Sequence, residues 1–209
     1  MSAAVALDFE RAAELKRKIF ALTHIQDVAL VSHEEPLPYN RESRPYIDIL
    51  GRIEAYDISN ISGTSAVGSM VVFEEGKPAK SQYRKFKIKT VVGANDVACL
   101  EEVMRRRLAR AELQPKAWPL PELMVIDGGK PQVNRVQQVL DELQVALPIV
   151  GLAKGFDRKQ DVLIFDPANR ELKRVVETNK EILQRARDEA HRFAISYHRK
   201  LRGKRSLLG

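Results

Sequence analysis

Two aspartates follow apolar segments and could together bind a divalent cation. Residues 52–60 alternate apolar and polar side chains and carry Asp57 near their end, and the apolar run 123–126 is followed directly by Asp127. Phosphodiester hydrolysis needs an activated water and a stabilised leaving oxygen, and Mg²⁺ or Mn²⁺ held by carboxylates provides both. The alternative is that each aspartate only caps a turn at a strand end. With that alternative open, the pair predicts a metal site that cuts nucleic acid.

A histidine and a glycine pair lie near the same elements in the chain. His191 falls beside the apolar stripe of the last predicted helix, where it could reach a neighbouring metal, although such a histidine is more often structural. Gly128 and Gly129 follow Asp127 at a predicted strand-to-helix turn, where backbone N–H groups can approach a phosphate. Because the Walker spacing is missing, a tight turn is the better explanation of this pair.

Basic side chains form three clusters, and the formal net charge is +7. The clusters are Arg84, Lys85, Lys87 and Lys89; Arg105, Arg106, Arg107 and Arg110; and Lys154, Arg158 and Lys159. Such clusters around an acid pair favour a groove for the DNA backbone, and the simpler alternative is a solvated charged surface. We expect Arg105 and Arg106 among the DNA contacts. No series of aromatic residues indicates sequence-specific binding of single strands.

The order of predicted elements indicates how the two aspartates are brought together. Strands are predicted at 52–58, 64–74, 79–90, 122–127 and 149–153, a hairpin at 161–176, and helices at about 95–111, 131–144 and 179–197. This is an α/β pattern of three antiparallel strands followed by parallel strands with flanking helices, as in an RNase H-like mixed sheet. In that topology the first and fourth strands are parallel neighbours, which places Asp57 and Asp127 at one edge. Other mixed α/β folds remain an alternative.

The remaining sequence predicts the domain organisation. Residues 8–23 form an amphipathic helix, which packs on its own domain or on a partner, within a segment 1–30. A proline-rich linker is predicted at 31–51, the main domain at 52–200 and a basic tail at 201–209. A single cysteine, Cys99, excludes a disulfide framework and a cysteine-based zinc site. With no membrane-length apolar run and no signal peptide, we expect a cytoplasmic protein without a membrane partner.

Five ordered motifs resemble the C-terminal endonuclease domain of the UvrC family, the nuclease subunit of the bacterial excinuclease ABC of nucleotide excision repair. They span residues 56–59, 93–96, 125–130, 151–155 and 187–194. Residues 7–19 also resemble the second helix of the UVR motif, through which UvrC meets UvrB. The resemblance implies an RNase H-like fold, damaged duplex DNA as substrate and UvrB as a partner through this partial motif.

The resemblance also implies roles for particular residues. The family's metal-dependent Asp-Asp-His site, which makes the 5′ incision beside a lesion, corresponds to Asp57, Asp127 and His191. Asp96 matches a further acid of the family. The candidates for DNA contact in matching motifs are Lys130, Lys154 and Arg158.

This chain departs from the family pattern in several places. Asn60 stands where the family usually has histidine, and Pro131 where it usually has glycine. Neither change removes an expected ligand. The N-terminal nuclease domain and the C-terminal helix-hairpin-helix motifs are not found, so we expect either an excised piece or a reduced relative. Two other functions stay open: a non-catalytic adaptor that binds DNA or a repair protein, and a structure-selective nuclease or recombination factor on the same fold.

Overall fold

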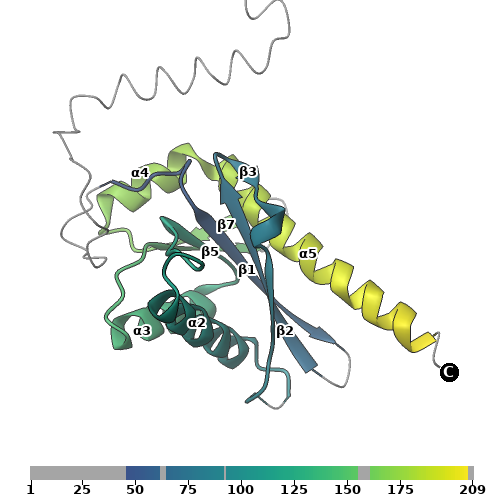
Figure 1. The fold of residues 1–209 in the computed structure, drawn as a ribbon. Coiled ribbons are helices and arrows are strands. Elements are labelled where there is room, and N and C mark those ends of the chain that lie inside the picture. Colours follow the sequence, from purple (N-terminus) through teal and green to yellow (C-terminus); the bar gives the residue numbers. More distant parts are fainter. Residues whose placement is uncertain (1–45, 62–64, 92, 155–160, 207–209) are drawn as a thin grey trace, which may run out of the picture. The chain divides into compact units, whose positions relative to one another are not determined.

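One mixed sheet organises the described part of the chain. The computed structural model describes residues 46–61, 65–91, 93–154 and 161–206, and within them seven strands form a single sheet (Figure 1). The predicted helix at 8–23, the UVR-like motif and Arg158 lie outside the described residues. The sheet carries the argument about function because it holds both aspartates.

The elements follow one another in the order that the sequence predicts for most of the chain. They are β1 (Ile53–Ile61), β2 (Ser65–Glu74), β3 (Lys77–Pro78), the 3-10 helix η2 (Lys80–Gln82), β4 (Arg84–Lys87), α2 (Asp96–Leu113), β5 (Leu123–Asp127), α3 (Lys130–Glu142), β6 (Ile149–Lys154), β7 (Asp161–Ile164), α4 (Arg170–Thr178) and α5 (Lys180–Ser206). The sheet order is β3-β2-β1-β5-β6-β7, with β4 also paired to β2. Strand β1 is antiparallel to β2 and parallel to β5. This confirms the RNase H-like mixed sheet.

The strand register determines where the two aspartates lie. Tyr56 of β1 pairs with Ile126 of β5, so the next residues along these parallel strands are Asp57 and Asp127. Side chains alternate between the faces of a sheet, and neighbours in register share a face. The two aspartates therefore project together on the face opposite Tyr56. Asp127 is the last residue of β5, as the sequence predicts, whereas Asp57 is the middle residue of β1, because β1 continues to Ile61 and is longer than the predicted strand 52–58.

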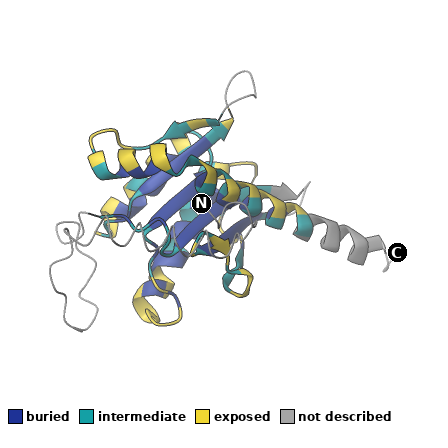
Figure 2. Cartoon of the chain, turned by 90° about the horizontal axis from the view of Figure 1, so that it is seen from above, coloured by how far each residue is buried: buried dark blue, intermediate teal, exposed yellow. Residues whose placement is uncertain are grey.

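Helices cover both faces of the sheet and make two hydrophobic cores. Tyr56 and Met70 pack with residues of α2 and α3, such as Leu100 and Val136, on one face. The opposite face packs against α4 and α5, with Ala190 among the buried helical residues. Figure 2 shows strands that are largely buried between helices whose outer surfaces are exposed. Asp57 shares the parity of Ile53 and Ala55 and so lies on the α5 side.

The predicted hairpin at 161–176 is wrong beyond its first strand. Residues 170–178 form helix α4, and the side chain of Asn169 caps it by accepting a hydrogen bond from the backbone N–H of Leu172. Leu172, Val175 and Val176 are buried, and their spacing is that of a helix face rather than of a strand. The turn-like residues before them are a helix N-terminus.

The predicted third strand at 79–90 is also wrong in extent. Its regular part is β4, preceded by η2. After Ile88 the chain leaves the sheet, because the backbone N–H groups of Lys89 and Thr90 donate to the Glu102 carboxylate on α2.

Two observations bear on the predicted domain limits. Ile47 and Ile49 of the predicted linker are buried in the core on the α5 side. At the other end, α5 continues to Ser206, so the predicted boundary between residues 200 and 201 falls within a continuous helix.

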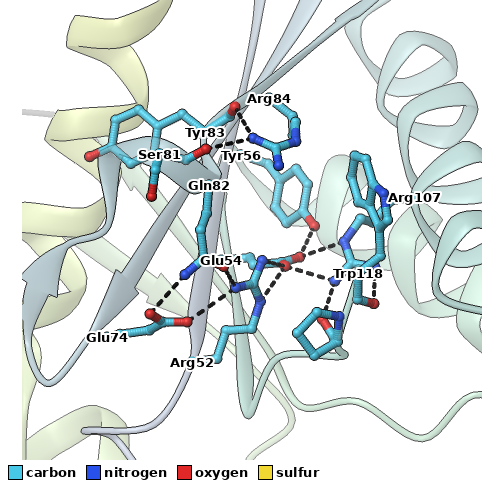
Figure 3. A network of polar contacts seen from close by, with 11 residues as sticks. Arg52, Glu54, Tyr56, Glu74, Ser81, Gln82, Tyr83, Arg84, Arg107 and Trp118 are labelled. Carbon is cyan, nitrogen blue, oxygen red and sulfur yellow. Dashed lines mark hydrogen bonds and ion pairs between the residues drawn. The ribbon is translucent and has the colours of Figure 1, made fainter. Parts of the chain in front are cut away.

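A buried polar network joins α2 to β1 just before Asp57 (Figure 3). Arg107 donates from Nε and Nη2 to the two carboxylate oxygens of Glu54 at 2.9 and 2.7 Å, and both side chains are fully buried. The Tyr56 hydroxyl and the Arg52 guanidinium also donate to Glu54. Arg107, which the sequence places in a basic cluster, is therefore an internal residue that links α2 to the strand carrying Asp57.

Candidate metal centre

Asp57, Asp127 and His191 form one cluster of potential metal ligands. One ligand atom from each lies within 4.8 Å of the other two, and no other such group occurs among the described residues. The Nδ1 atom of His191 is 3.9 Å from Asp57 Oδ2 and 3.8 Å from Asp127 Oδ2. These distances are too long for hydrogen bonds and leave space between the three groups. The structure thus brings the three predicted residues together.

The carboxylates of this cluster are held in an unfavourable environment for negative charge. Burial, followed by the neighbouring charge of Asp127, raises the pKa of Asp57 to about 6, and the effect of His191 is opposite. Burial also raises the pKa of Asp127, against the lowering effects of Arg187, His191 and Lys154. Two carboxylates that share one site repel each other when both are ionised. A cation between them would remove that repulsion.

A further observation, an unpartnered buried oxygen of Asp57, indicates that these three side chains fit a divalent cation. Asp57 Oδ2, which faces His191, is buried and has no hydrogen-bond partner among the described residues. Buried polar atoms in folded proteins nearly always have a partner, so an unpartnered oxygen beside two other ligand atoms points to a missing ligand. Two carboxylates and an imidazole are suitable donors for Mg²⁺ or Mn²⁺.

Helix α5 brings His191 to the two aspartates on the sheet through a buried stripe on its inner side. Leu183, Ala186, Ala190 and Ala194 are all buried, at the spacing of one helix face. Small alanines let the helix backbone approach the sheet closely, and His191, directly after Ala190, lies at the margin of that stripe. Its side chain is half exposed, which leaves the cluster open on one side.

The structure also shows charged residues near the cluster that the sequence did not single out. Arg187, one helical turn before His191, forms ion pairs with Asp161 of β7 and with Asp188. Gln184 donates to Asp161 Oδ2 at 2.8 Å. The spacing Gln184, Arg187, His191 places all three on one side of α5, which is a signal that the sequence did contain.

Asp96 lies close to the cluster without belonging to it. It is the first residue of α2, and its charge acts on Asp57 by raising the pKa of that carboxyl, as the smallest of five contributions. Asn95 caps the helix by accepting from the backbone N–H of Ala98. Asp96 is exposed, and the structure gives no ligand geometry for it.

The glycine turn after β5 is a tight turn in the structure. The Gly128 N–H donates to the carbonyl of Leu152, and the Gly129 N–H donates to Gln132 Oε1. Both donors that could approach a phosphate are therefore already used. Pro131 stands in the first turn of α3, where its missing N–H costs nothing.

The residues predicted to contact DNA have different surroundings. Lys130 and Lys154 are exposed, and the charge of Lys154 acts on Asp127. Arg105 pairs with Glu101 and Glu142 on the α2 and α3 helices.

Arg106 pairs with Glu102 and donates to the Lys87 carbonyl. Arg105 and Arg106 therefore already have partners within the fold. Their contact with DNA stays a prediction.

Fold and cluster together define a class. A mixed sheet in the order described, with one carboxylate in the middle of β1 and one at the end of the parallel neighbour β5, is an RNase H-like α/β domain with a candidate metal centre. A family model for the UvrC RNase H endonuclease domain matches residues 46–195. The chain belongs to this family.

Full-length relatives are much longer than this chain. "UvrABC system protein C" of Clostridium tetani is 42% identical over 209 residues, which cover 93% of this chain and 33% of the relative. The protein of the same name from Dehalococcoides mccartyi strain CBDB1 is 49% identical over 162 residues, or 75% of this chain and 26% of the relative. The chain thus spans about a third or less of the curated relatives it matches.

Solved structures of endonuclease V are more distant. Human endonuclease V aligns over 51% of this chain and 46% of its own, with 20% identity and a TM-score of 0.37. Ciona intestinalis endonuclease V, solved in complex with a 24mer DNA, covers 66% of this chain and 58% of its own, with 16% identity and a TM-score of 0.39.

None of the helices in the described part of the chain combines the length and apolar character that a membrane crossing requires.

Proposed function

We propose that this chain is a divalent-metal-dependent DNA endonuclease that makes the 5′ incision in nucleotide excision repair. The observation that carries the proposal is the cluster of Asp57, Asp127 and His191, whose ligand atoms lie within 4.8 Å of one another. Membership in the UvrC RNase H endonuclease domain family supports the same activity. The substrate is damaged duplex DNA, and the place of action is the cytoplasm.

Each residue of the cluster has a distinct part in this proposal. Asp57 and Asp127 would hold Mg²⁺ or Mn²⁺, which when bound supplies an activated water and stabilises the leaving oxygen. Asp57, buried on the sheet, is the fixed ligand, and Asp127 closes the pair from the adjacent strand. His191 completes the ligand set or passes a proton to the leaving oxygen, for which its half-exposed position on α5 is suited.

The basic residues and partners complete the proposal. Exposed Lys130 and Lys154 would contact the DNA backbone beside the cluster, and Arg105, Arg106 and Arg158 are further proposed contacts. The relatives are named as components of a UvrABC system. We extend this to the chain as a proposal: a UvrB-type protein recruits it through residues 7–19, which look like part of the UVR motif.

Nicking of supercoiled plasmid tests the activity. We expect the parent protein to nick plasmid with Mn²⁺ and to be inactive with EDTA, and we expect Asp127→Asn to lose at least a hundredfold in rate because one charged ligand is gone. The matched control is Asp141→Asn, the same chemical change at an exposed position of α3. This control should nick like the parent.

The outcomes separate the competing functions. Binding of DNA without nicking at any Mn²⁺ or Mg²⁺ concentration would favour the non-catalytic adaptor. Equal nicking by Asp127→Asn and the parent would place the activity elsewhere. The incision position is tested on a duplex with a single lesion, together with UvrA and UvrB, where a cut only on the 3′ side of the lesion would contradict the proposal.

A further inference from the structure

We propose that Asp161 is a positioning residue of the metal centre, which holds Arg187 away from Asp127. This inference rests on the proposed function, because it assigns a role at the same site. It adds two residues, Asp161 and Arg187, that lie outside the predicted ligand set. We call Asp161, Gln184 and Arg187 the α5 clamp.

The contacts of the clamp join β7, the edge strand of the sheet, to α5 at two residues that lie three positions apart. Asp161, the first residue of β7, accepts a hydrogen bond from Gln184 at 2.8 Å and forms an ion pair with Arg187. The side chains of Arg187 and Asp161 are only 11% and 13% exposed. A charge-assisted hydrogen bond is stronger than a neutral one, so the Asp161 carboxylate holds the Arg187 guanidinium in place. His191 follows Arg187 by four residues, or about 6 Å along the axis.

The charges around Asp127 explain why the clamp matters for a cation. Arg187 is close enough to act on Asp127 electrostatically, yet its ion pairs within 4.0 Å are with Asp161 and Asp188 among the described residues. If Asp161 lost its charge, the guanidinium would keep only exposed Asp188 as an ion-pair partner among the described residues, and Asp127 is a further carboxylate on which its charge already acts. A guanidinium on Asp127 would occupy a ligand oxygen and repel a cation.

Lys154 is a second positive charge that acts on Asp127. The cation therefore already competes with one positive charge at this carboxylate before any displacement of Arg187. Lys154 stands opposite Asp161 in the β6–β7 register. Asp161 therefore has Arg187 as its ion-pair partner and Lys154 as its neighbour across the strands, and the charge of Lys180 also acts on it. It is held as a carboxylate, since hydrogen bonding by Arg187 lowers its pKa.

A purely structural clamp and a charge-holding clamp predict different effects of the substitutions on cation affinity. In a structural clamp, removing either partner loosens α5 and weakens cation binding in the same direction. In the proposed arrangement, removing Asp161 frees a harmful charge, whereas removing Arg187 removes that charge altogether. The double variant should therefore bind the cation better than Asp161→Asn alone, which no loss of structure would produce.

Calorimetric titration of Mn²⁺ into the full chain tests this. We expect Asp161→Asn to weaken Mn²⁺ binding roughly tenfold, Arg187→Gln to change it by less than about threefold, and the double variant to return to within about threefold of the parent. Asp141→Asn on α3 is the matched control, since it also accepts from a glutamine and should bind like the parent. Thermal unfolding in EDTA shows that each variant is folded.

The results decide between the possibilities. Unchanged Mn²⁺ affinity in Asp161→Asn overturns the assignment and leaves the proposed function intact, because the parent still binds and nicks. Equal weakening in both single variants and the double overturns the charge-holding role. If Asp161→Asn fails to fold, stronger or unchanged binding by Arg187→Gln supports the role, and tenfold weaker binding overturns it. A parent that binds no Mn²⁺ overturns the proposed function together with this inference.

Discussion

At the scale of single residues, the cluster places negative charge where the fold disfavours it. Asp57 is 7% exposed, stands beside Asp127 and has an oxygen without a partner among the described residues. Such an arrangement lowers the stability of the metal-free protein, and a bound cation would offset it. The site is therefore expected to show opposite effects on stability and on activity when its charge is removed.

The pH dependence of the stability of Asp57→Asn tests whether the charge of Asp57 destabilises the metal-free protein. The folded pKa of Asp57, about 6, lies above the ordinary value of 3.8, so the folded protein holds this proton more tightly than the unfolded chain. The corresponding stability is present below pH 3.8 and is lost as pH rises through 6, by about 3 kcal/mol. We expect metal-free Asp57→Asn to melt roughly 5–10 °C above the parent at pH 7.5, with the difference vanishing near pH 4.

Thermal melts in EDTA between pH 4 and 8 measure this difference, and Asp141→Asn should give none at any pH. Added Mn²⁺ should raise the melting temperature of the parent and leave that of Asp57→Asn unchanged. A difference that is equally large at pH 4 and pH 7.5 would show that the stabilisation does not come from the ionisation of Asp57.

The sequence could predict the three cluster residues and could not predict their surroundings. The pairing of Asp57 with Asp127 follows from the topology, because β1 and β5 are parallel neighbours and the two residues are in register, although β1 runs four residues beyond Asp57. The role of His191 came from family resemblance, since a histidine at the margin of an apolar stripe is more often structural. The partner of Arg187 lies 26 residues away on another element, and only the folded chain shows which acid that is.

At the scale of elements, the hairpin prediction at 161–176 was wrong because a short apolar pattern fits both a strand and a helix. Leu172, Val175 and Val176 fit a helix, but the short segment after a strand and a turn also resembles the second half of a hairpin. Arg107 carried a usable signal: it lies seven residues after buried Leu100, on the inner face of α2. Its position in a run of arginines pointed instead to a surface role.

Arg107→Met tests the link between α2 and β1. The substitution keeps much of the side-chain volume and leaves the fully buried Glu54 carboxylate with Arg52 and Tyr56 as its remaining partners. We expect the free energy of unfolding to fall by about 3 kcal/mol, because a buried charge loses its main counter-charge. Denaturant titration measures this.

Arg105→Met on the same helix is the control for Arg107→Met, and its half-exposed ion pairs should contribute less than about 1 kcal/mol. Combining Arg107→Met with Glu54→Gln should recover part of the loss, since the unpaired charge is then removed. Equal effects of the two arginine variants would mean that the network in Figure 3 contributes little to stability.

At the scale of the whole molecule, the net charge of +7 is compatible with DNA binding but does not locate it. Many of the described arginines serve the fold: Arg107 is internal, and Arg105, Arg106 and Arg135 pair with glutamates of α2 and α3. Lys130 and Lys154 are exposed near the ends of β5, which carries Asp127, and of its neighbour β6. The main surface for the DNA backbone is therefore expected at these strand ends, with Arg105 and Arg106 of α2 as further proposed contacts.

A paired substitution of lysines tests this location, because salt dependence counts phosphate contacts. Each lysine on a phosphate releases counterions, so removing two contacts should lower the slope of log affinity against log salt by about two. We expect Lys130→Gln with Lys154→Gln to show this loss on a fluorescent duplex in EDTA, where no cleavage occurs. The control is Lys116→Gln with Lys173→Gln, two exposed lysines on the loop after α2 and on α4. Both double variants lose the same net charge, so equal slopes would show that binding follows overall charge and not these strand ends.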